Sequence, residues 1–196
     1  MRSFGSTRSP RPSGSIRLWL VFAGEDHPRA CTGRRLVSHG FARAIRSAEE
    51  MRSRAIVLDP HSPVPLSGAD RPVARKGGVI AIDCSWNRLA GRGDLPPASV
   101  GPDGKGHRRL PFLLATNPQH FGRLAELNTA EALGAALYVL GATEQARRLL
   151  EGFAGGEAFF EINRERLDRY AEAALPAAIV EAEGALFGPP AEGSPR

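Results

Sequence analysis

The sequence predicts an α/β protein whose parallel sheet is covered by helices. In the first part of the chain, short apolar segments typical of strands are separated by helical or irregular stretches, whereas the pattern after residue 128 is helical. Residues 78–82 are apolar without interruption, as in a strand buried on both faces. Such strands belong mainly to parallel sheets with helices on their faces.

The expected strands are short and rich in apolar residues, and they cover 16–22, 55–58, 78–82 and 110–115. Apolar residues recur at helical spacing from Leu36 to Ile45, which predicts a helix from Arg34 to Glu49. Prolines at positions 60, 63, 65 and 72 predict irregular structure up to about Arg75. Glycines and prolines indicate a loop over 91–106.

The C-terminal part contains the clearest helix signals. Asn128 followed by Glu131 resembles a capping box, Gly141 marks the end of that helix, and Thr143 is expected to cap the next one. A last helical segment carries the apolar residues Phe159, Phe160, Ile162, Leu167 and Tyr170.

Length and composition limit the class of protein. The 196 residues suffice for one domain or two small ones, and 42% hydrophobic with 24% charged residues excludes disorder throughout. No apolar run approaches the ~20 residues of a membrane span, and the basic start lacks the apolar stretch of a secretion signal. The two cysteines, Cys31 and Cys84, form no disulfide framework. We therefore expect a cytoplasmic protein with a flexible basic arm at 1–14 and a flexible tail at 186–196.

The charge pattern indicates an anionic partner. The net charge is +5, and all basic residues except Lys76 and Lys105 are arginines. Nucleic acid is the commonest partner of such a chain. The alternatives are that the arginines reflect the base composition of the genome or that they lie on ordinary solvent-exposed faces. The residues that we expect to contact RNA are Arg34, Arg35, Arg43, Arg46, Arg75 and Lys76.

Familiar nucleotide and metal signatures are absent. Gly91-Arg92-Gly93 lacks the third glycine of a dinucleotide fingerprint, and the chain has no P-loop. His27 and Cys31 suggest a zinc site together with His39 or Cys84, but the spacings are too loose for structural zinc. We expect no metal.

Two strand ends carry polar residues that suit a ligand site. Asp83-Cys84-Ser85-Trp86 directly follows the most apolar strand, at the edge where parallel sheets bind ligands. The alternative is that Asp83 caps the next turn and Trp86 fills the core. Asn117-Pro118 ends the strand at 110–115, where the amide serves either a ligand or only the turn.

Four stretches together resemble one family. They are 27–36 (HPRACTGRRL), 81–86 (AIDCSW), 109–118 (RLPFLLATNP) and 127–132 (LNTAEA). In this order and spacing they are similar to the small-subunit ribosomal RNA aminocarboxypropyltransferases of archaea and eukaryotes. Residues 153–156 and 160–163, with Leu167 and Tyr170, continue a likeness that covers about residues 16–175.

The resemblance implies a small N-terminal α/β domain at 15–75 and a C-terminal domain at 76–185. The second domain would be SPOUT-like, trefoil-knotted and helical in its C-terminal part. It would bind S-adenosyl-L-methionine as a co-substrate and transfer the 3-amino-3-carboxypropyl group to N3 of a uridine or N1-methylpseudouridine, releasing methylthioadenosine. That atom is accessible only in an unpaired nucleotide.

The resemblance also implies roles for individual residues. Asp83 would help to take the N3 proton or orient the base, and Trp86 would shield the methyl group and hold the sulfonium by cation–π attraction. Thr32 would hold the amino-acid end of the cofactor. The other expected cofactor contacts are Leu58, Ile80, Ile82, Leu113, Asn128 and Ala132.

Two alternatives belong to other functional classes. One is a SPOUT-type RNA methyltransferase, and the other is a non-catalytic RNA-binding factor of ribosome assembly. For the family interpretation, the expected partner is small-subunit rRNA or a pre-ribosomal particle, and no membrane is expected. No obvious dimer helix is present, so a monomer is expected.

Overall fold

A five-stranded parallel sheet forms the centre of the computed structural model, which describes residues 14–22, 32–46, 55–83 and 106–188. The strands lie in the order β2-β1-β4-β3-β5. Their bounds are β1 Leu18–Phe22, β2 Arg43–Ile45, β3 Ile56–Leu58, β4 Val79–Asp83 and β5 His107–Arg108. The expected α/β class and the strands around 16–22, 55–58 and 78–82 are therefore confirmed.

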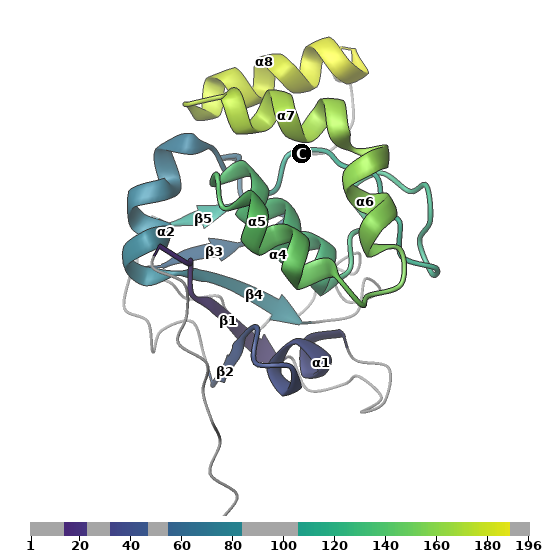
Figure 1. Cartoon of the computed structure of the whole chain (residues 1–196). Helices are drawn as coiled ribbons and strands as arrows, with labels where there is room; N and C mark the ends of the chain where they lie inside the picture. The colour runs from purple at the N-terminus through teal and green to yellow at the C-terminus, as the bar shows by residue number, and fades with distance from the viewer. Residues whose placement is uncertain (1–13, 23–31, 47–54, 84–105, 189–196) are drawn as a thin grey trace, which may run out of the picture.

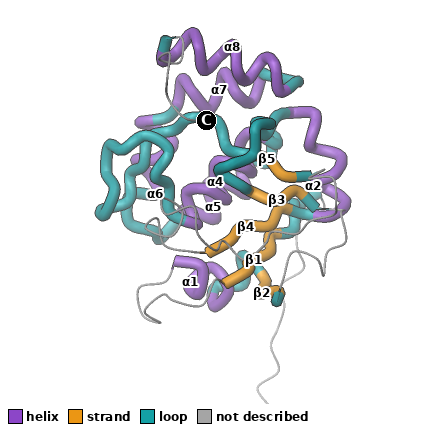
Figure 2. The backbone as a smooth tube through the Cα atoms, turned by 180° about the vertical axis from the view of Figure 1, so that it is seen from behind, coloured by secondary structure: helices purple, strands orange, loops and turns teal. Residues whose placement is uncertain are grey.

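Helices cover the sheet and extend away from it in layers (Figures 1 and 2). They are α1 Thr32–Ser38, α2 Arg71–Gly77, α4 Thr129–Val139, α5 Thr143–Leu150, α6 Gly156–Ile162, α7 Arg164–Glu172 and α8 Pro176–Phe187, with a short 3-10 turn at Gly68–Asp70. α4 contacts β4 directly and is itself packed against α1, α5 and α7. α7 and α8 form the outermost layer, far from the sheet (Figure 1). None of the helices in the described part is long and apolar enough to cross a bilayer.

The side chains of β4 alternate between two cores. Val79 and Ala81 belong to the main core, which the sheet shares with α4 and the other helices, whereas Ile80 packs with Val21 and Val57 on the opposite face. Asp83 follows Val79 and Ala81 in this alternation, so its carboxylate lies on the α4 side of the sheet.

The expected helix from Arg34 to Glu49 is wrong in its second half. α1 ends at Ser38, and Gly40 then adopts φ +76°, a left-handed conformation that stops the helix. The chain continues as β2, which pairs with β1 at the edge of the sheet. Arg43 therefore lies on a strand, and Arg46 follows it, so these two arginines do not share a helical face with Arg35.

The prediction that prolines keep the chain irregular up to Arg75 is wrong at its end, because α2 begins at Arg71. Pro72 occupies the first turn of α2, where no backbone hydrogen bond from its nitrogen is required. α2 also spans the expected boundary between residues 75 and 76, and strands from both sides of that boundary share one sheet. At the next helix start, Thr143 is the first residue of α5 rather than its cap, which is Ala142.

Residues 110–115 do not form the expected strand. The edge strand β5 ends at Arg108, and Pro111 supplies no backbone donor to a ladder. Side chains hold this segment instead: Asn163 accepts from Leu114 N at 2.8 Å and donates to Leu114 O at 2.9 Å. The last helical segment expected at 159–170 is interrupted at this asparagine, between α6 and α7.

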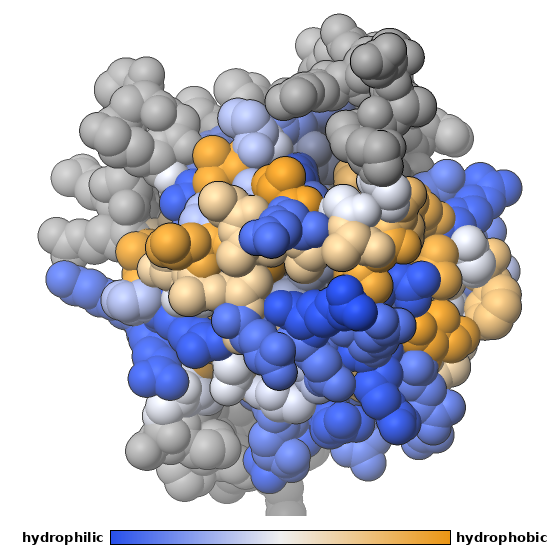
Figure 3. Space-filling view, turned by 90° about the horizontal axis from the view of Figure 1, so that it is seen from above, coloured by the Kyte–Doolittle hydropathy of each residue, from blue (hydrophilic) through white to orange (hydrophobic). Residues whose placement is uncertain are grey.

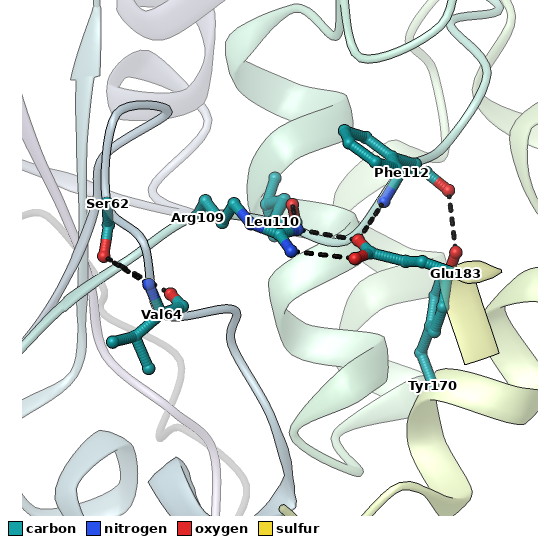
Figure 4. Close-up of polar contacts among 7 residues, drawn as sticks. All are labelled: Ser62, Val64, Arg109, Leu110, Phe112, Tyr170 and Glu183. Carbon is teal, nitrogen blue, oxygen red and sulfur yellow. Dashed lines mark hydrogen bonds and ion pairs between the residues drawn. The ribbon is translucent and has the colours of Figure 1, made fainter. Parts of the chain in front are cut away.

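A buried ion pair fastens α8 to the same segment (Figure 4). Arg109 donates to both carboxylate oxygens of Glu183 at 2.7 and 2.8 Å, and Phe112 N donates to Glu183 Oε1 at 3.1 Å. Tyr170 of α7 donates its hydroxyl to Phe112 O at 3.1 Å. The carboxylate is almost completely buried, so it needs these donors to offset its desolvation.

Candidate active site

The site begins with a buried carboxylate at the carboxyl end of β4. Asp83 is 6% exposed, and the hydroxyl of Thr129, the first residue of α4, donates to its Oδ1. Parallel sheets bind their ligands at this edge, where the strands end and the connecting loops begin. The position of Asp83 is therefore one from which a carboxylate can meet a ligand.

Gly33 brings the start of α1 against the same carboxylate. A Cβ atom at this position would lie 2.5 Å from Asp83 Oδ2 and 3.1 Å from Phe22 Cε1, so no larger residue fits without a shift. Thr32, the residue before it, is half-buried and begins α1. The starts of α1 and α4 thus meet at Asp83, and each of these helices begins with a threonine.

A second buried carboxylate fixes the start of α4. Glu131 is 2% exposed, and its Oε1 accepts from Thr116 N, Thr116 Oγ1 and Asn117 N at 2.7–2.9 Å. Its Oε2 accepts from Asn117 Nδ2 at 2.7 Å and from Asn128 N at 2.8 Å. Asn128 Oδ1 in turn accepts from Glu131 N at 2.9 Å, which completes the predicted capping box.

Asn117 serves the turn and the scaffold. Its Oδ1 accepts from His120 N at 3.1 Å, and its amide nitrogen donates to Glu131. Of the two alternatives left open by the sequence, the structure therefore shows the turn. Glu131 was recognised only as a capping residue, and nothing in the spacing indicated that it also binds residues 116 and 117.

The apolar residues expected around a cofactor lie on both faces of the sheet. Leu58 and Leu113 belong to the main core on the α4 side, and Ala132 in the first turns of α4 is half-buried there. Ile80 packs into the opposite core, and alternation puts Ile82 on the same face. A ligand beside Asp83 would meet these two isoleucines through their backbone.

The basic residues do not form one continuous group. Arg34 and Arg35 lie in α1 beside the Asp83 site, with Arg34 5.6 Å from the Phe22 ring centre. Arg35 is 4.6 Å from the ring centre of Phe153 and donates to Gly152 O at 3.1 Å.

Arg75 and Lys76 lie elsewhere. They end α2 just before the first residue of β4, whereas Asp83 is the last residue of that strand. A strand of this length spans roughly 13 Å, so Arg75 and Lys76 lie near the amino end of β4 and Asp83 lies at its carboxyl end. Trp86, with Cys31 and Cys84, lies outside the described residues, and its predicted contacts are not addressed by the structure.

The fold and the site define an α/β protein with a candidate ligand site where the strands of a parallel sheet end, and with arginines beside it. The family model described as "Ribosome biogenesis protein, C-terminal" matches residues 56–187. The chain is 40% identical over 177 residues to the 16S rRNA aminocarboxypropyltransferase of Methanosarcina acetivorans, covering 88% of this chain and 95% of the relative. It is 39% identical to the 18S rRNA aminocarboxypropyltransferase of Schizosaccharomyces pombe, covering 86% of this chain and 55% of that longer protein.

A solved structure agrees with these sequence matches. The SAM-dependent rRNA:acp-transferase Tsr3 from Vulcanisaeta distributa superposes with a TM-score of 0.76 at 36% identity, covering 88% of this chain and 89% of that one. The chain therefore belongs to the family of 16S and 18S rRNA aminocarboxypropyltransferases. The family resemblance recognised from the sequence is confirmed.

Proposed function

We propose that this chain transfers the 3-amino-3-carboxypropyl group of S-adenosylmethionine to a base of small-subunit rRNA and releases methylthioadenosine. The names of its relatives support the reaction. The structural observation that carries the proposal is the buried carboxylate of Asp83, enclosed by the starts of α1 and α4 at the ligand-binding edge of the sheet.

The residues at this edge fit S-adenosylmethionine. A carboxylate suits its cationic groups, and a threonine hydroxyl suits its amino-acid end. Leu58 and Leu113, apolar residues of the core on the α4 side of the sheet, are proposed to contact adenosine. The glycine at position 33 lets the Asp83 carboxylate lie directly against the backbone of α1. When bound, S-adenosylmethionine supplies a sulfonium whose attached carbons are electrophilic.

Asp83 is proposed as the general base. Forming the bond from N3 of a uridine-type base to the carboxypropyl carbon, while the carbon–sulfur bond breaks, leaves the N3 proton to be removed. A positioned carboxylate accelerates such a transfer by roughly 10²–10⁴-fold. The hydroxyl of Thr129 keeps the carboxylate oriented. Trp86 is proposed to cover the methyl group, so that the longer chain faces the base.

Product analysis tests the reaction. Small subunits from cells that lack the protein are incubated with the purified chain and S-adenosylmethionine, and the released nucleoside and the rRNA mass are measured. Methylthioadenosine and an rRNA adduct with the mass of the carboxypropyl group are expected. Adenosylhomocysteine would instead identify a methyltransferase, and calorimetry without binding heat for S-adenosylmethionine would identify a non-catalytic assembly factor.

Asp83→Asn tests the role of the carboxylate. We expect the transfer rate to fall by about 10²-fold or more, because an amide removes no proton, while S-adenosylmethionine affinity changes less. The matched control is Asp168→Asn on α7: this residue is exposed, and its Oδ1 accepts from Tyr138, which an amide oxygen can also do. Equal transfer rates for the Asp83 variant and the parent would remove Asp83 from the mechanism.

The finer architecture and cellular context are part of the same proposal. We propose a trefoil knot within residues 76–185, an N-terminal α/β part at 15–75 whose strands join the same sheet, and a cytoplasmic monomer that acts on small-subunit rRNA or a pre-ribosomal particle. Arg34 and Arg35 are proposed to contact the RNA backbone from α1, because both are exposed beside the Asp83 site.

A further inference from the structure

Phe121 is the most exposed large apolar side chain of the part that the structure describes, at 65%. It lies on the turn that follows Asn117-Pro118, in the loop segment that extends past α6 in Figure 1. Its neighbours Gln119, Gly122 and Arg123 are also exposed. An exposed phenylalanine ring forgoes the favourable free energy of burial unless a molecule outside the chain covers it.

The turn that carries Phe121 is held firmly by backbone hydrogen bonds. Ala115 N donates to Arg123 O, and Gly122 N donates to Ala115 O, each at 2.8 Å. Ala125 N donates to Leu113 O at 2.8 Å, and Leu114 pairs with Leu124 as an isolated antiparallel bridge. The exposure of the ring is therefore a fixed feature of the turn.

The same turn is fastened to the start of α4. Asn117 donates to Glu131, which also accepts from Asn128 N, and the next residue, Thr129, donates to Asp83. These hydrogen bonds leave little freedom for the turn to move relative to the Asp83 carboxylate. Phe121 is thus held at a set distance from the proposed reaction centre.

A cationic side chain lies two residues after the ring in the same turn. The side chain of Arg123 is 61% exposed, and it donates to Glu126 at 3.1 Å. A hydrogen bond from His120, with Arg123 beside it, lowers the pKa of Glu126, so this carboxylate stays charged at neutral pH and holds the Arg123 guanidinium in place. An aromatic ring beside fixed cations is the arrangement by which proteins bind single-stranded nucleic acid.

We infer that Phe121 stacks on an unpaired nucleobase of the rRNA next to the modified nucleotide. This inference rests on the proposed function, since modification at a pairing atom requires an unpaired target. A base drawn into the site leaves its neighbour without a stacking partner, and an exposed ring on a firm turn replaces that partner.

The surroundings of Phe121 favour RNA over a protein partner. A protein-docking surface is typically a continuous apolar patch, whereas the residues next to this ring in the chain are His120 and Gly122, followed by Arg123. Within residues 118–125 the other large apolar side chain that is exposed is Leu124, at 42%. The outer face of the α7–α8 layer offers the contrast, because apolar residues gather across it (Figure 3). Leu175 at the start of α8 and Val180 within it are 60% and 51% exposed. The net charge of +5 also favours an anionic partner.

Kinetics and fluorescence test the inference. We expect Phe121→Ala to raise the KM for deproteinised small-subunit rRNA about tenfold, with kcat and S-adenosylmethionine affinity within about twofold of the parent. Phe121→Tyr should restore the parent KM, because its ring stacks equally well. Leu175→Ala is the control matched for exposure, and it should leave KM unchanged.

Phe121→Trp reports on the contact directly. On titration with a short oligouridine, its fluorescence should be quenched beyond the change seen in the parent, whose own tryptophans provide the baseline. An unchanged KM in Phe121→Ala, or no additional quenching, overturns the inference. A defect seen only with whole subunits and absent with deproteinised rRNA would indicate a protein contact and overturn it as well. If the parent protein releases no methylthioadenosine, the proposed function is refuted instead. The quenching experiment measures RNA binding alone, so its result does not depend on that function.

Discussion

Replacing Glu131 by glutamine should destabilise the protein and loosen the site together. In the parent, its two oxygens accept five hydrogen bonds from Thr116, Asn117 and Asn128. A glutamine keeps one acceptor oxygen and presents an NH₂ group to the other donors. Oriented so that it retains the three bonds of Oε1, it leaves Asn117 Nδ2 and Asn128 N without an acceptor.

The magnitude follows from these two donors. A buried donor that loses its partner costs about 1–3 kcal/mol, so we expect Glu131→Gln to lower the free energy of unfolding by about 4 kcal/mol. For a chain of this length, each kcal/mol lowers Tm by about 2–4 °C, which gives a decrease of about 8–16 °C. The cost is large because the carboxylate is 2% exposed and water cannot replace it.

Urea and thermal unfolding followed by circular dichroism measure this effect. Glu172→Gln is the matched control, since Glu172 is exposed on α7 and its substitution should change stability by no more than about 0.5 kcal/mol. A Glu131→Gln variant within about 1 kcal/mol of the parent would refute the reasoning. In that case the 116–117 turn would be held by something other than this carboxylate.

Two further substitutions test the site and the core. Gly33→Ala should lower transfer activity at least about tenfold, because the new methyl group displaces the Asp83 carboxylate. Its Tm should change by only a few degrees, because alanine favours the helix. Unchanged activity in the product assay would contradict the close approach of Gly33 and Asp83. Burial raises the pKa of Tyr170 above its ordinary value, so the neutral hydroxyl contributes stability that is complete below about pH 10 and is lost as pH rises toward the folded-state pKa. The free energy of unfolding of Tyr170→Phe should therefore fall less steeply above pH 10 than that of the parent in urea titrations, and equal slopes would contradict this.

The central strands and the start of α4 were predictable because their signals are local. Residues 78–82 are apolar in an unbroken run, and Asn128 with Glu131 form a capping box through a three-residue spacing that is visible in the sequence. Asp83 was singled out for the same reason, since a carboxylate directly after a buried strand is unusual. These features depend on neighbours within a few residues.

The errors arose where distant contacts decide the structure. The spacing from Leu36 to Ile45 fits a helix, but Gly40 stops it and pairing with β1 draws Arg43 into a strand. Residues 110–115 have strand composition, yet the amide of Asn163 binds the backbone that a neighbouring strand would otherwise pair. No local sequence pattern indicates that Asn163 binds Leu114, because the two residues are 49 positions apart.

Side chains from three later parts of the chain bracket residues 109–117. Glu131 holds the end of this stretch, Asn163 its middle and Glu183 its beginning. A growing polypeptide emerges from its N-terminus, so the sheet strands are available long before the last of these brackets has been synthesised. Arg109 can be fixed only after Glu183 has been synthesised, 74 residues later, so a nascent chain would contain β4 and Asp83 before the beginning of this stretch is held in place.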